Sequence, residues 1–511
     1  MNIEAEFFYK SQPRLQFIFD SPNHCSVILG MLALVLCGAL ALLWGNGKSV
    51  ARTASMIACA VMLLGLLGGL VLTYSRGGWV AFFAGLAFYW VTAKPKKIIP
   101  VSVLVGFLCL LWLLPHGWQR MNSMTDVTED RSILHRVMVW QGALTMAADH
   151  PLTGIGGDSF GNEFSAWYQP LTMNTRYLAA LSNYLTLASE RGFLALFIYL
   201  LLLGCPFAIC FYLARKRQNA LIISLLAVEV TYLISGLFTY STSFWHVTGL
   251  FLFVYIIVLG YLGYHLVKKN LTRKTGCKIL ATTAGSVGAV VLVLYFTGLF
   301  FLMELPCRVS RLQISDDIPA VMVVPQNIPV YGTIIHFHDK GGSVQEDGKS
   351  SLRPMAQAGF MIIGCDYRAG GIDGLRDAET VMRWAINTFS EQGVPLYLTG
   401  FGVGGRMAIL VSGNIEFRDK VKGVAAVNAA VEWPFPELSP LDQLGSLQAP
   451  VLLIYHDASA PKMLASNIAN FLETAKVRNK SVQMICIPND DNQLNLDGLP
   501  VEKIDEFFRQ L

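Results

Sequence analysis

The sequence has little charge: only 14% of its 511 residues are Asp, Glu, Lys or Arg, whereas an average soluble domain carries about 25%. The formal net charge of +4 is too small to indicate a nucleic-acid partner. The ten cysteines lie mostly within apolar runs and form no C-x-x-C pair, which argues against a zinc site or a disulfide framework. Hydrophobic residues, in contrast, make up 53% of the chain. This balance predicts that much of the protein lies in lipid.

The first half of the chain consists of long apolar runs separated by short polar breaks. A membrane-spanning helix needs about 20 apolar residues. By that criterion the sequence predicts eight spans, at residues 26–45, 54–74, 77–93, 98–115, 184–213, 219–239, 245–267 and 279–303. We therefore expect a polytopic α-helical membrane bundle of about eight helices as the first domain, residues 1–303.

Basic residues fall in alternate loops between these spans. The odd-numbered loops are short and contain Lys48 and Arg52, then Lys94, Lys96 and Lys97, then Arg215, Lys216 and Arg217, and finally Lys268, Lys269, Arg273, Lys274 and Lys278. Short basic loops face the cytoplasm. The N-terminus, the long loop 116–183 and all residues after 303 are therefore expected outside the cytoplasm.

The pattern changes after residue 303. Short β-rich runs such as "GTIIHFH", "FMIIGCDY" and "LYLTG" alternate with helix-like stretches such as "LRDAETVMRWAINTF". Continuous apolar strands that alternate with helices are typical of an α/β domain with a mostly parallel sheet. Residues 304–511 are long enough to bury a core of their own. We expect them to form this second domain.

A glycine-rich turn in the second domain, "LTGFGVGGRM", fits two patterns. Gly400, Gly402 and Gly405 match the dinucleotide-binding loop G-x-G-x-x-G. They also match the strand-turn-helix elbow G-x-S-x-G of hydrolases, with Gly402 in place of the nucleophilic serine. A dinucleotide loop should open the first βα unit and be followed about 20 residues later by an acidic residue near a strand end. Strand-like runs precede this turn, and Asp419 lies before a strand, which disfavours a nucleotide site.

The order of elements in the second domain resembles an α/β-hydrolase. The segment "HFHDKGG" (336–342) stands where that fold keeps its oxyanion loop, and "GFGVGG" stands at the elbow. Asp457, after the strand-like "VLLIYH", stands where the catalytic acid is usual. Asp490, within "NDDN", stands where a histidine is expected. The resemblance therefore implies the fold and also places the positions of its catalytic triad.

Two of the three triad positions hold unsuitable residues. Nucleophilic catalysis needs an oxygen or sulfur at the elbow and a base within its reach. Gly402 has no side chain, and no histidine follows His456 in the sequence. We therefore expect a pseudoenzyme, a hydrolase-like fold without the triad. An unrelated activity that uses His338, Asp366 or His456 remains an alternative.

An arginine at the outer end of a predicted span is the first candidate for chemistry in the membrane half. "LTYSRGGWV" places Arg76 at that position. Ionisable residues within or beside spans are costly and usually functional. An arginine whose stem lies along the span with its charge at the interface is the common alternative.

The loop 116–183 and the following span hold several short motifs. In chain order they are R-x-x-x-W from Arg136 to Trp140, "HPLTGIGG" from His150, N-x-L from Asn183 and E-x-G from Glu190. Together with "SRGG" and the Pro-Asn segment "FDSPNHC" (19–25), they resemble the O-antigen ligase family of polytopic membrane glycosyltransferases, which includes the O-antigen polymerases. The resemblance covers residues 15–265 and rests on the order of the motifs, since no single one is specific.

The resemblance implies a reaction and a location. A glycan on a polyprenyl diphosphate carrier is transferred to an acceptor hydroxyl, on the lipid A core or on another surface glycan, with inversion and with no metal or cofactor. The site faces outward from the bacterial cytoplasmic (inner) membrane, so the second domain would be periplasmic. Guanidinium groups pair bidentately with phosphate oxygens, so Arg76 and Arg136 are expected to bind the diphosphate. The sequence does not distinguish a ligase from a polymerase.

The chain departs from the family pattern at Ser182, where family ligases have a histidine that is proposed to activate the acceptor. A serine is a poor general base near neutral pH. His150, Glu190 and His135 are the other candidates for that role. Each has a structural alternative: His150 in a loop turn, Glu190 at a helix start and His135 on the surface.

The membrane half also has fewer spans than is usual in the family. This leaves open a shortened member, a protein completed by a partner subunit in the membrane, or an inactive one. A carrier-lipid transporter and a non-catalytic scaffold for glycan assembly therefore remain alternatives to the transferase.

Overall fold

The structure is a computed structural model of the chain. The residues that it describes are 15, 19, 21–44, 50–92, 98–113, 131–171, 173, 175–217, 219–240, 245–268, 271–389, 394–456, 462–487 and 500–511. They form two compact units. The first unit comprises Met1–Gly161 and Thr175–Leu302, and the second comprises Asn162–Asn174 and Met303–Leu511. A short piece of the loop before residue 183 is therefore part of the second unit.

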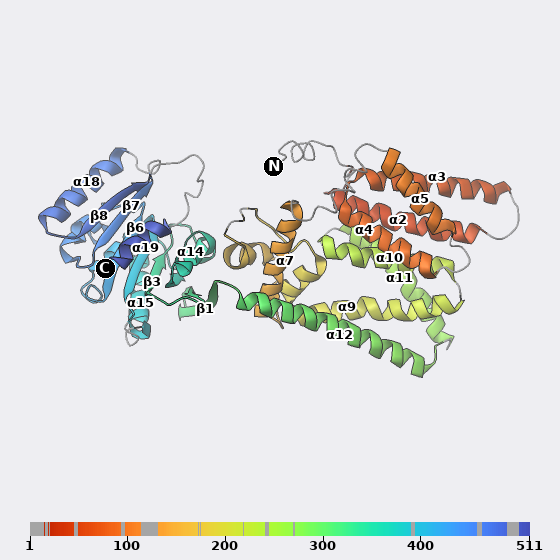
Figure 1. The fold of residues 1–511 in the computed structure, drawn as a ribbon. Helices are drawn as coiled ribbons and strands as arrows, with labels where there is room; N and C mark the ends of the chain where they lie inside the picture. The colour runs from red at the N-terminus through yellow and green to blue at the C-terminus, as the bar shows by residue number, and fades with distance from the viewer. Residues whose placement is uncertain are drawn as a thin grey trace. The chain divides into compact units, whose positions relative to one another are not determined.

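Apolar helices make up most of the first unit (Figure 1). Among the described residues they are α2 (Pro22–Leu43), α3 (Val50–Leu72), α4 (Arg76–Thr92), α5 (Ile98–Leu113), α9 (Asn183–Arg217), α10 (Ala220–Phe238), α11 (Trp245–Val267) and α12 (Arg273–Met303). Each of the eight predicted spans coincides with one of them. Six are long and apolar enough to cross a membrane. The prediction of a polytopic helical bundle is confirmed.

Helices α4 and α5 are shorter than the other six. They have 17 and 16 residues, which corresponds to about 25 Å of helix. The hydrocarbon core of a bilayer is about 30 Å thick. Apart from Arg76 at the start of α4, both are predominantly apolar, so they belong to the bundle even though each falls slightly short of a full crossing.

Helix α10 lies at the centre of the first unit and packs against α2, α4, α9 and α11. Small residues allow this close packing. A Cβ atom at Gly38 of α2 would lie 2.0 Å from Ser224 Oγ of α10, and one at Gly85 of α4 would lie 2.2 Å from Thr231 Oγ1. Close approach at small residues is the usual means of helix association in a membrane, where no hydrophobic drive operates between helices.

The segment between α5 and α9 contains the described helices α7 (Arg131–Asp149) and α8 (Phe160–Glu163), and the short π-helix η2 (Phe164–Tyr168). Figure 1 shows α7 running across α9 rather than along it. Helix α9 is interrupted at Gly192, where φ is 83° and ψ is 169°. This backbone conformation is nearly exclusive to glycine, so α9 consists of two helical segments.

The second unit contains one sheet of eight strands: β1 (Cys307–Ser315), β2 (Ile318–Pro325), β3 (Gly332–Phe337), β4 (Phe360–Cys365), β5 (Leu396–Phe401), β6 (Val421–Val427), β7 (Val451–His456) and β8 (Val482–Ile487). Their order in the sheet is β1-β2-β4-β3-β5-β6-β7-β8. Strand β2 pairs antiparallel with β1 and β4, and all other pairs are parallel. This order is that of the α/β-hydrolase fold, so the predicted fold class is confirmed.

Helices cover both faces of this sheet (Figure 1). The described ones of four residues or more are α13 (Val344–Asp347), the π-helix η3 (Gly348–Leu352), α14 (Arg353–Gln357), α15 (Gly371–Phe389), α16 (Val403–Gly413), α17 (Pro440–Gln443), α18 (Lys462–Val477) and α19 (Val501–Arg509). Strands β3 and β4 are buried along their whole length, which explains their continuous apolar runs. The loops at the carboxyl ends of β3 and β5 form the elbow region.

Candidate functional site

The start of helix α4 is joined to the start of α2. Ser75, directly before Arg76, donates a hydrogen bond through Oγ to Asn23 Oδ1 at 2.8 Å. The same Oγ accepts from the Gly78 N–H at 3.3 Å and so caps the helix. The Pro-Asn segment and the "SRGG" motif, 52 positions apart in the sequence, therefore form one structural feature.

The two glycines of "SRGG" allow two other helices to approach. A Cβ atom at Gly78 would lie 1.9 Å from Ser26 Oγ of α2. A Cβ atom at Gly77 would lie 3.0 Å from Cβ of Phe238, the last residue of α10. Arg76 thus begins α4 directly beside the C-terminal end of α10.

Arg136 meets the same end of α10 from helix α7. Its Nη1 donates a hydrogen bond to the Phe238 carbonyl at 2.5 Å. Trp140, one helical turn later, lies against the Phe238 ring with centroids 6.3 Å apart. The R-x-x-x-W spacing therefore places two side chains of α7 on one residue of α10. The last carbonyls of a helix have no partner within the helix, and Arg136 supplies one.

Ser182 also binds the end of α10. Its Oγ donates a hydrogen bond to the Gly236 carbonyl at 3.1 Å, and the side chain is buried. The last turn of α10, Gly236–Phe238, thus brings together Ser182, Arg136 and the helix that begins with Arg76. These are three of the five residues predicted for the membrane site.

His135 lies beside Arg136 on α7 and pairs with a residue that the sequence analysis did not single out. Its Nδ1 is 3.0 Å from the Tyr177 hydroxyl oxygen. Burial raises the pKa of Tyr177, and the positive charge of Arg136 partly offsets this effect. No motif marks Tyr177, because its role depends on how the loop folds back onto α7.

Glu190 and the turn after His150 form a separate group. The Glu190 carboxylate accepts hydrogen bonds from the backbone N–H groups of Asp158 and Phe160, and its carbonyl accepts from Gly156 N at 3.1 Å. Phe193 N, just past the break in α9, donates to the Pro151 carbonyl at 2.7 Å. The motifs "HPLTGIGG" and E-x-G therefore bind each other through backbone groups.

Glycines fix the spacing in this group. A Cβ atom at Gly154 would lie 2.2 Å from the Glu190 carbonyl carbon, and one at Gly192 would lie 2.5 Å from that of Leu152. Gly154 also has a positive φ of 66°. Both positions need glycine because two backbones touch there.

His150 and Glu190 are distant from the end of α10. Fourteen positions along α7 separate His150 from Arg136, which corresponds to about 21 Å of helix. Eight positions separate Glu190 from Ser182, or about 12 Å. His150 Nε2 lies 3.9 Å from Asp149 Oδ2 at the surface. The structure thus divides the predicted site residues into two groups.

The glycine-rich turn of the second unit has the backbone of a nucleophile elbow. Gly402 has φ 55° and ψ −116°, between β5 and α16, and such strain is typical of the elbow. A Cβ atom at Gly402 would lie 2.2 Å from Asp339 Oδ1. A side chain in the nucleophile position would therefore collide with the Asp339 carboxylate.

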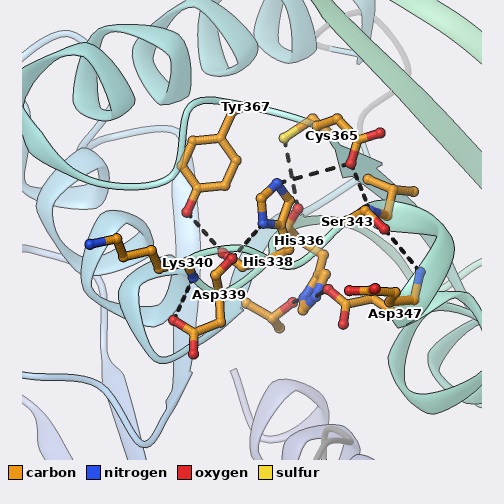
Figure 2. A network of polar contacts seen from close by, with 12 residues as sticks. His336, His338, Asp339, Lys340, Ser343, Asp347, Cys365 and Tyr367 are labelled. Atoms are coloured by element: carbon orange, nitrogen blue, oxygen red, sulfur yellow. Dashed lines mark hydrogen bonds and ion pairs between the residues drawn. The ribbon is translucent and has the colours of Figure 1, made fainter.

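Asp339 also occupies the place of the oxyanion. Its Oδ1 accepts hydrogen bonds from the backbone N–H groups of Val403 and Lys340, both at 2.7 Å, and Figure 2 shows the Lys340 contact in the loop after β3. In a serine hydrolase the N–H of the residue after the nucleophile binds the oxyanion. An internal carboxylate takes that place here.

The remaining polar residues of the elbow region hold loops together (Figure 2). His338 Nδ1 lies 2.7 Å from the Asp339 carbonyl, and its Nε2 lies 4.0 Å from Asp366 Oδ1. Asp366 accepts a hydrogen bond from Val344 N at 2.7 Å. His336, which the sequence analysis did not single out, is buried between Thr399 and Asp347, with 3.0 Å to each. The predicted positions Asp457 and Asp490, and the side chain of His456, lie outside the described part of the chain.

Known proteins resemble the two parts of the chain separately. The family model described as O-antigen ligase matches residues 61–200. A comparison with curated proteins gave no match. The solved structures that are similar cover the α/β part. An esterase of Pyrobaculum calidifontis in a monoclinic form is 19% identical, with a TM-score of 0.33, over 40% of this chain and 85% of its own.

Two further solved structures are also similar to the α/β part of the chain. A hormone-sensitive lipase from a metagenome library is 14% identical, with a TM-score of 0.34, over 41% of this chain and 88% of its own. The Francisella virulence factor BioJ is 13% identical, with a TM-score of 0.34, over 43% and 93%. At such identities the likeness concerns the fold alone. The matched region 61–200 includes the start of α4, helix α7 and the turn that holds Glu190, whereas the end of α10 lies beyond it. The chain is thus a multi-pass membrane protein with an O-antigen ligase domain at residues 61–200, joined to an α/β unit of hydrolase fold.

Proposed function

We propose that this protein transfers a glycan from a polyprenyl diphosphate carrier to an acceptor hydroxyl at the outer face of the bacterial cytoplasmic membrane. The acceptor is the lipid A core or another surface glycan. The observation that carries the proposal is the meeting of two arginine-bearing segments at the end of α10, where both segments belong to the region 61–200 that matches the O-antigen ligase family. The alternation of basic loops supports an outward-facing site.

The carrier diphosphate binds between Arg76 and Arg136. The Phe238 carbonyl holds one corner of the Arg136 guanidinium and so fixes its orientation. Arg76 stands at the N-terminus of α4, where the helix dipole favours an anion. Both charges stabilise the diphosphate as the glycosidic bond to it breaks and negative charge develops on it.

The acceptor oxygen attacks the anomeric carbon from the face opposite the diphosphate, so the configuration inverts. The bond from this carbon to the diphosphate oxygen breaks, and the carrier leaves as polyprenyl diphosphate. His135, paired with Tyr177 at 3.0 Å, accepts the acceptor proton in place of the histidine that the family pattern has at Ser182. Among the candidate bases His135 is favoured because it adjoins Arg136 in the sequence. Ser182 positions the end of α10.

Glu190 and His150 serve the architecture of the loop in this proposal. Glu190 binds the backbone of residues 158–160. At the break in α9, the Phe193 N–H donates a hydrogen bond to the Pro151 carbonyl in the turn after His150. The α/β unit performs no serine-hydrolase chemistry, because Gly402 supplies no nucleophile and Asp339 fills the oxyanion position.

A transfer assay with purified protein tests the proposal. Wild-type protein in detergent is given a polyprenyl-diphosphate-linked glycan and a lipid A-core acceptor, and the acceptor is followed on a gel. We expect a mobility shift that is lost in Arg136→Ala. Arg383→Ala is the matched control, because it removes an exposed arginine that pairs with Glu416 at 2.9 Å on the second unit. Bound carrier without transfer to either acceptor class would favour a scaffold. Flux of carrier lipid across sealed vesicles would favour a transporter.

A further inference from the structure

A short segment of the O-antigen ligase domain is built into the α/β unit. Residues Asn162–Asn174 belong to the second compact unit, although they lie within the region 61–200 that matches the ligase family. The segment includes the π-helix η2 (Phe164–Tyr168), whose Phe164, Trp167 and Tyr168 are buried. A surface loop of this length is usually exposed and mobile, so its burial needs partners.

A buried arginine is the first partner. Arg353, at the start of α14, is only 3% exposed. Its Nη1 donates to the Gln169 carbonyl at 2.7 Å and lies 3.5 Å from the Ala166 carbonyl. Ala166 lies within η2, and Gln169 directly follows it. Desolvating a guanidinium is costly unless it makes hydrogen bonds, and the contacts of Nη1 with this segment offset part of that cost.

A carboxylate at the other end of η2 is the second partner. Glu163 Oε2 lies 2.6 Å from Arg311 Nη2 on β1. Glu163 Oε1 accepts a hydrogen bond from Gln345 Nε2 of α13 at 3.0 Å. Glu163 is 13% exposed and Arg311 is 56% exposed, so the pair is accessible to substitution without a change in the core.

Close packing is the third element of the contact. A Cβ atom at Gly348, the first residue of η3, would lie 2.9 Å from the ring of Trp167. Lys349 donates a hydrogen bond through Nζ to the Met173 carbonyl. The segment is therefore held at its start by Glu163, in its middle by Trp167 and at its end by Met173.

We propose that the α/β unit is an anchor for the outer loop of the ligase domain, with Arg353 and Arg311 as positioning residues for glycan transfer. This inference rests on the proposed transferase function and assigns a role to the α/β unit that needs no chemistry at its elbow. The anchored segment lies in the chain between residues that bind Glu190 and residues that reach the end of α10. Before it, Phe160 N–H binds the Glu190 carboxylate; after it, Ala180 N binds Thr186 Oγ1 at 3.0 Å.

Position in the chain explains why an anchor matters. Tyr177, which pairs with His135, follows the anchored Met173 by four residues. Ser182, which binds the end of α10, follows by nine. Release of the segment would loosen the pair that we assign to proton transfer, and misplacement of a catalytic group by about 1 Å can cost about 100-fold in rate.

Charge reversal at the Glu163–Arg311 pair tests the anchor with two readouts. The first is trypsin cleavage after the exposed Arg176, followed by mass spectrometry in full-length protein in detergent. The second is kcat and KM for transfer. We expect Glu163→Arg to speed cleavage by about tenfold, since it places like charges at 2.6 Å, and to lower kcat with little change in the KM for the carrier-linked glycan. The double variant Glu163→Arg with Arg311→Glu restores both. Arg383→Glu, on the same unit but away from the segment, leaves both unchanged.

Gly348→Ala supplies a second test that leaves all charges in place. Alanine favours a helix over glycine, so the unit keeps its fold, while the methyl group pushes against Trp167. We expect faster cleavage and lower kcat here too. Faster cleavage with unchanged kcat would overturn the positioning role, and unchanged cleavage in both variants would overturn the anchor itself. If the wild-type protein transfers no glycan, the proposed function fails, while the cleavage readout still decides whether the segment is anchored.

Discussion

The Arg136 guanidinium lies 2.5 Å from the carbonyl oxygen of Phe238, 102 positions later in the chain. Phe238 is the last residue of α10, and its side chain touches the position of Gly77 in the "SRGG" turn. One residue without any sequence motif thus joins the two arginine-bearing segments. Because the carbonyl at a helix end carries partial negative charge, it holds the guanidinium without neutralising it. In the function that we propose, this contact fixes the orientation in which Arg136 meets the carrier diphosphate.

Ser182→Ala should retain transfer within about threefold, because in this account Ser182 caps the Gly236 carbonyl and takes no proton. The lost hydrogen bond should lower stability by about 1 kcal/mol. Transfer rates and thermal unfolding in detergent measure the two effects. A loss of transfer as large as that of His135→Ala, at unchanged stability, would show that Ser182 takes part in proton transfer.

Gly192→Ala should destabilise the membrane unit by about 3 kcal/mol or more, since alanine is strained at φ 83° and its Cβ would meet Leu152. The thermal unfolding midpoint of the protein in detergent measures this. Gly249→Ala in α11 is the control, because no atom lies within 4 Å of a Cβ there. Equal midpoints for the two variants would contradict the role of Gly192 in joining the break in α9 to the turn after His150.

Gly402→Ser should produce no esterase activity on p-nitrophenyl acetate. The chain has no histidine after His456 to serve as the base, and Asp339 occupies the space of the new side chain. The single variant should unfold at a lower temperature than wild type, and adding Asp339→Ala should recover part of the loss by removing the collision. Ester hydrolysis by either variant would show that the elbow is a usable active site.

The stability of the α/β unit should depend on Asp377 in a pH-dependent way. Hydrogen bonds from Arg368, at 2.7 and 2.8 Å, lower the pKa of the Asp377 carboxyl. A carboxyl with a lowered folded pKa stabilises the fold above its unfolded pKa of about 3.9 and loses this effect as the pH falls through the folded value. Asp377→Asn should therefore lower the unfolding midpoint at pH 7, and the difference from wild type should shrink as the pH falls below about 3.9.

A matched substitution on the same helix controls for the change of charge. Asp373→Asn removes an exposed carboxylate 3.6 Å from Arg376, and it should change neither midpoint because exposed pairs contribute little. A constant effect of Asp377→Asn across the pH range would mean that the residue acts through packing rather than through its charge.

The sequence predicted the elements of the fold well, because the physics that forms them is local. Apolar runs longer than about 17 residues have few alternatives to a membrane helix, and each predicted span coincides with a helix. The alternation of apolar strands with helices likewise predicted a mostly parallel sheet. The elbow at Gly402 was found from its glycines, since few residues adopt its backbone.

The candidate site was predicted only in part. Arg136 binds the Phe238 carbonyl, Ser182 binds the Gly236 carbonyl, and Gly77 beside Arg76 lies against Phe238, a residue that no pattern marked. His150 and Glu190 were grouped with them because motifs close in sequence suggest one site, whereas α7 carries His150 about 21 Å from Arg136. The place of Asp339 at the oxyanion position, and that of residues 162–174 in the α/β unit, depend on contacts between distant parts of the chain. Periodicity and local propensity carry no information about such contacts.

A double-mutant cycle at the two arginines tests the central claim most directly. Transfer of glycan from the polyprenyl diphosphate carrier is measured for wild type, Arg76→Ala, Arg136→Ala and the double variant. Groups that act together on one leaving group are strongly non-additive. We predict that each single variant loses transfer by about 100-fold or more, and that the double variant loses little beyond that. Transfer at the wild-type rate in both single variants would contradict a diphosphate site at the end of α10.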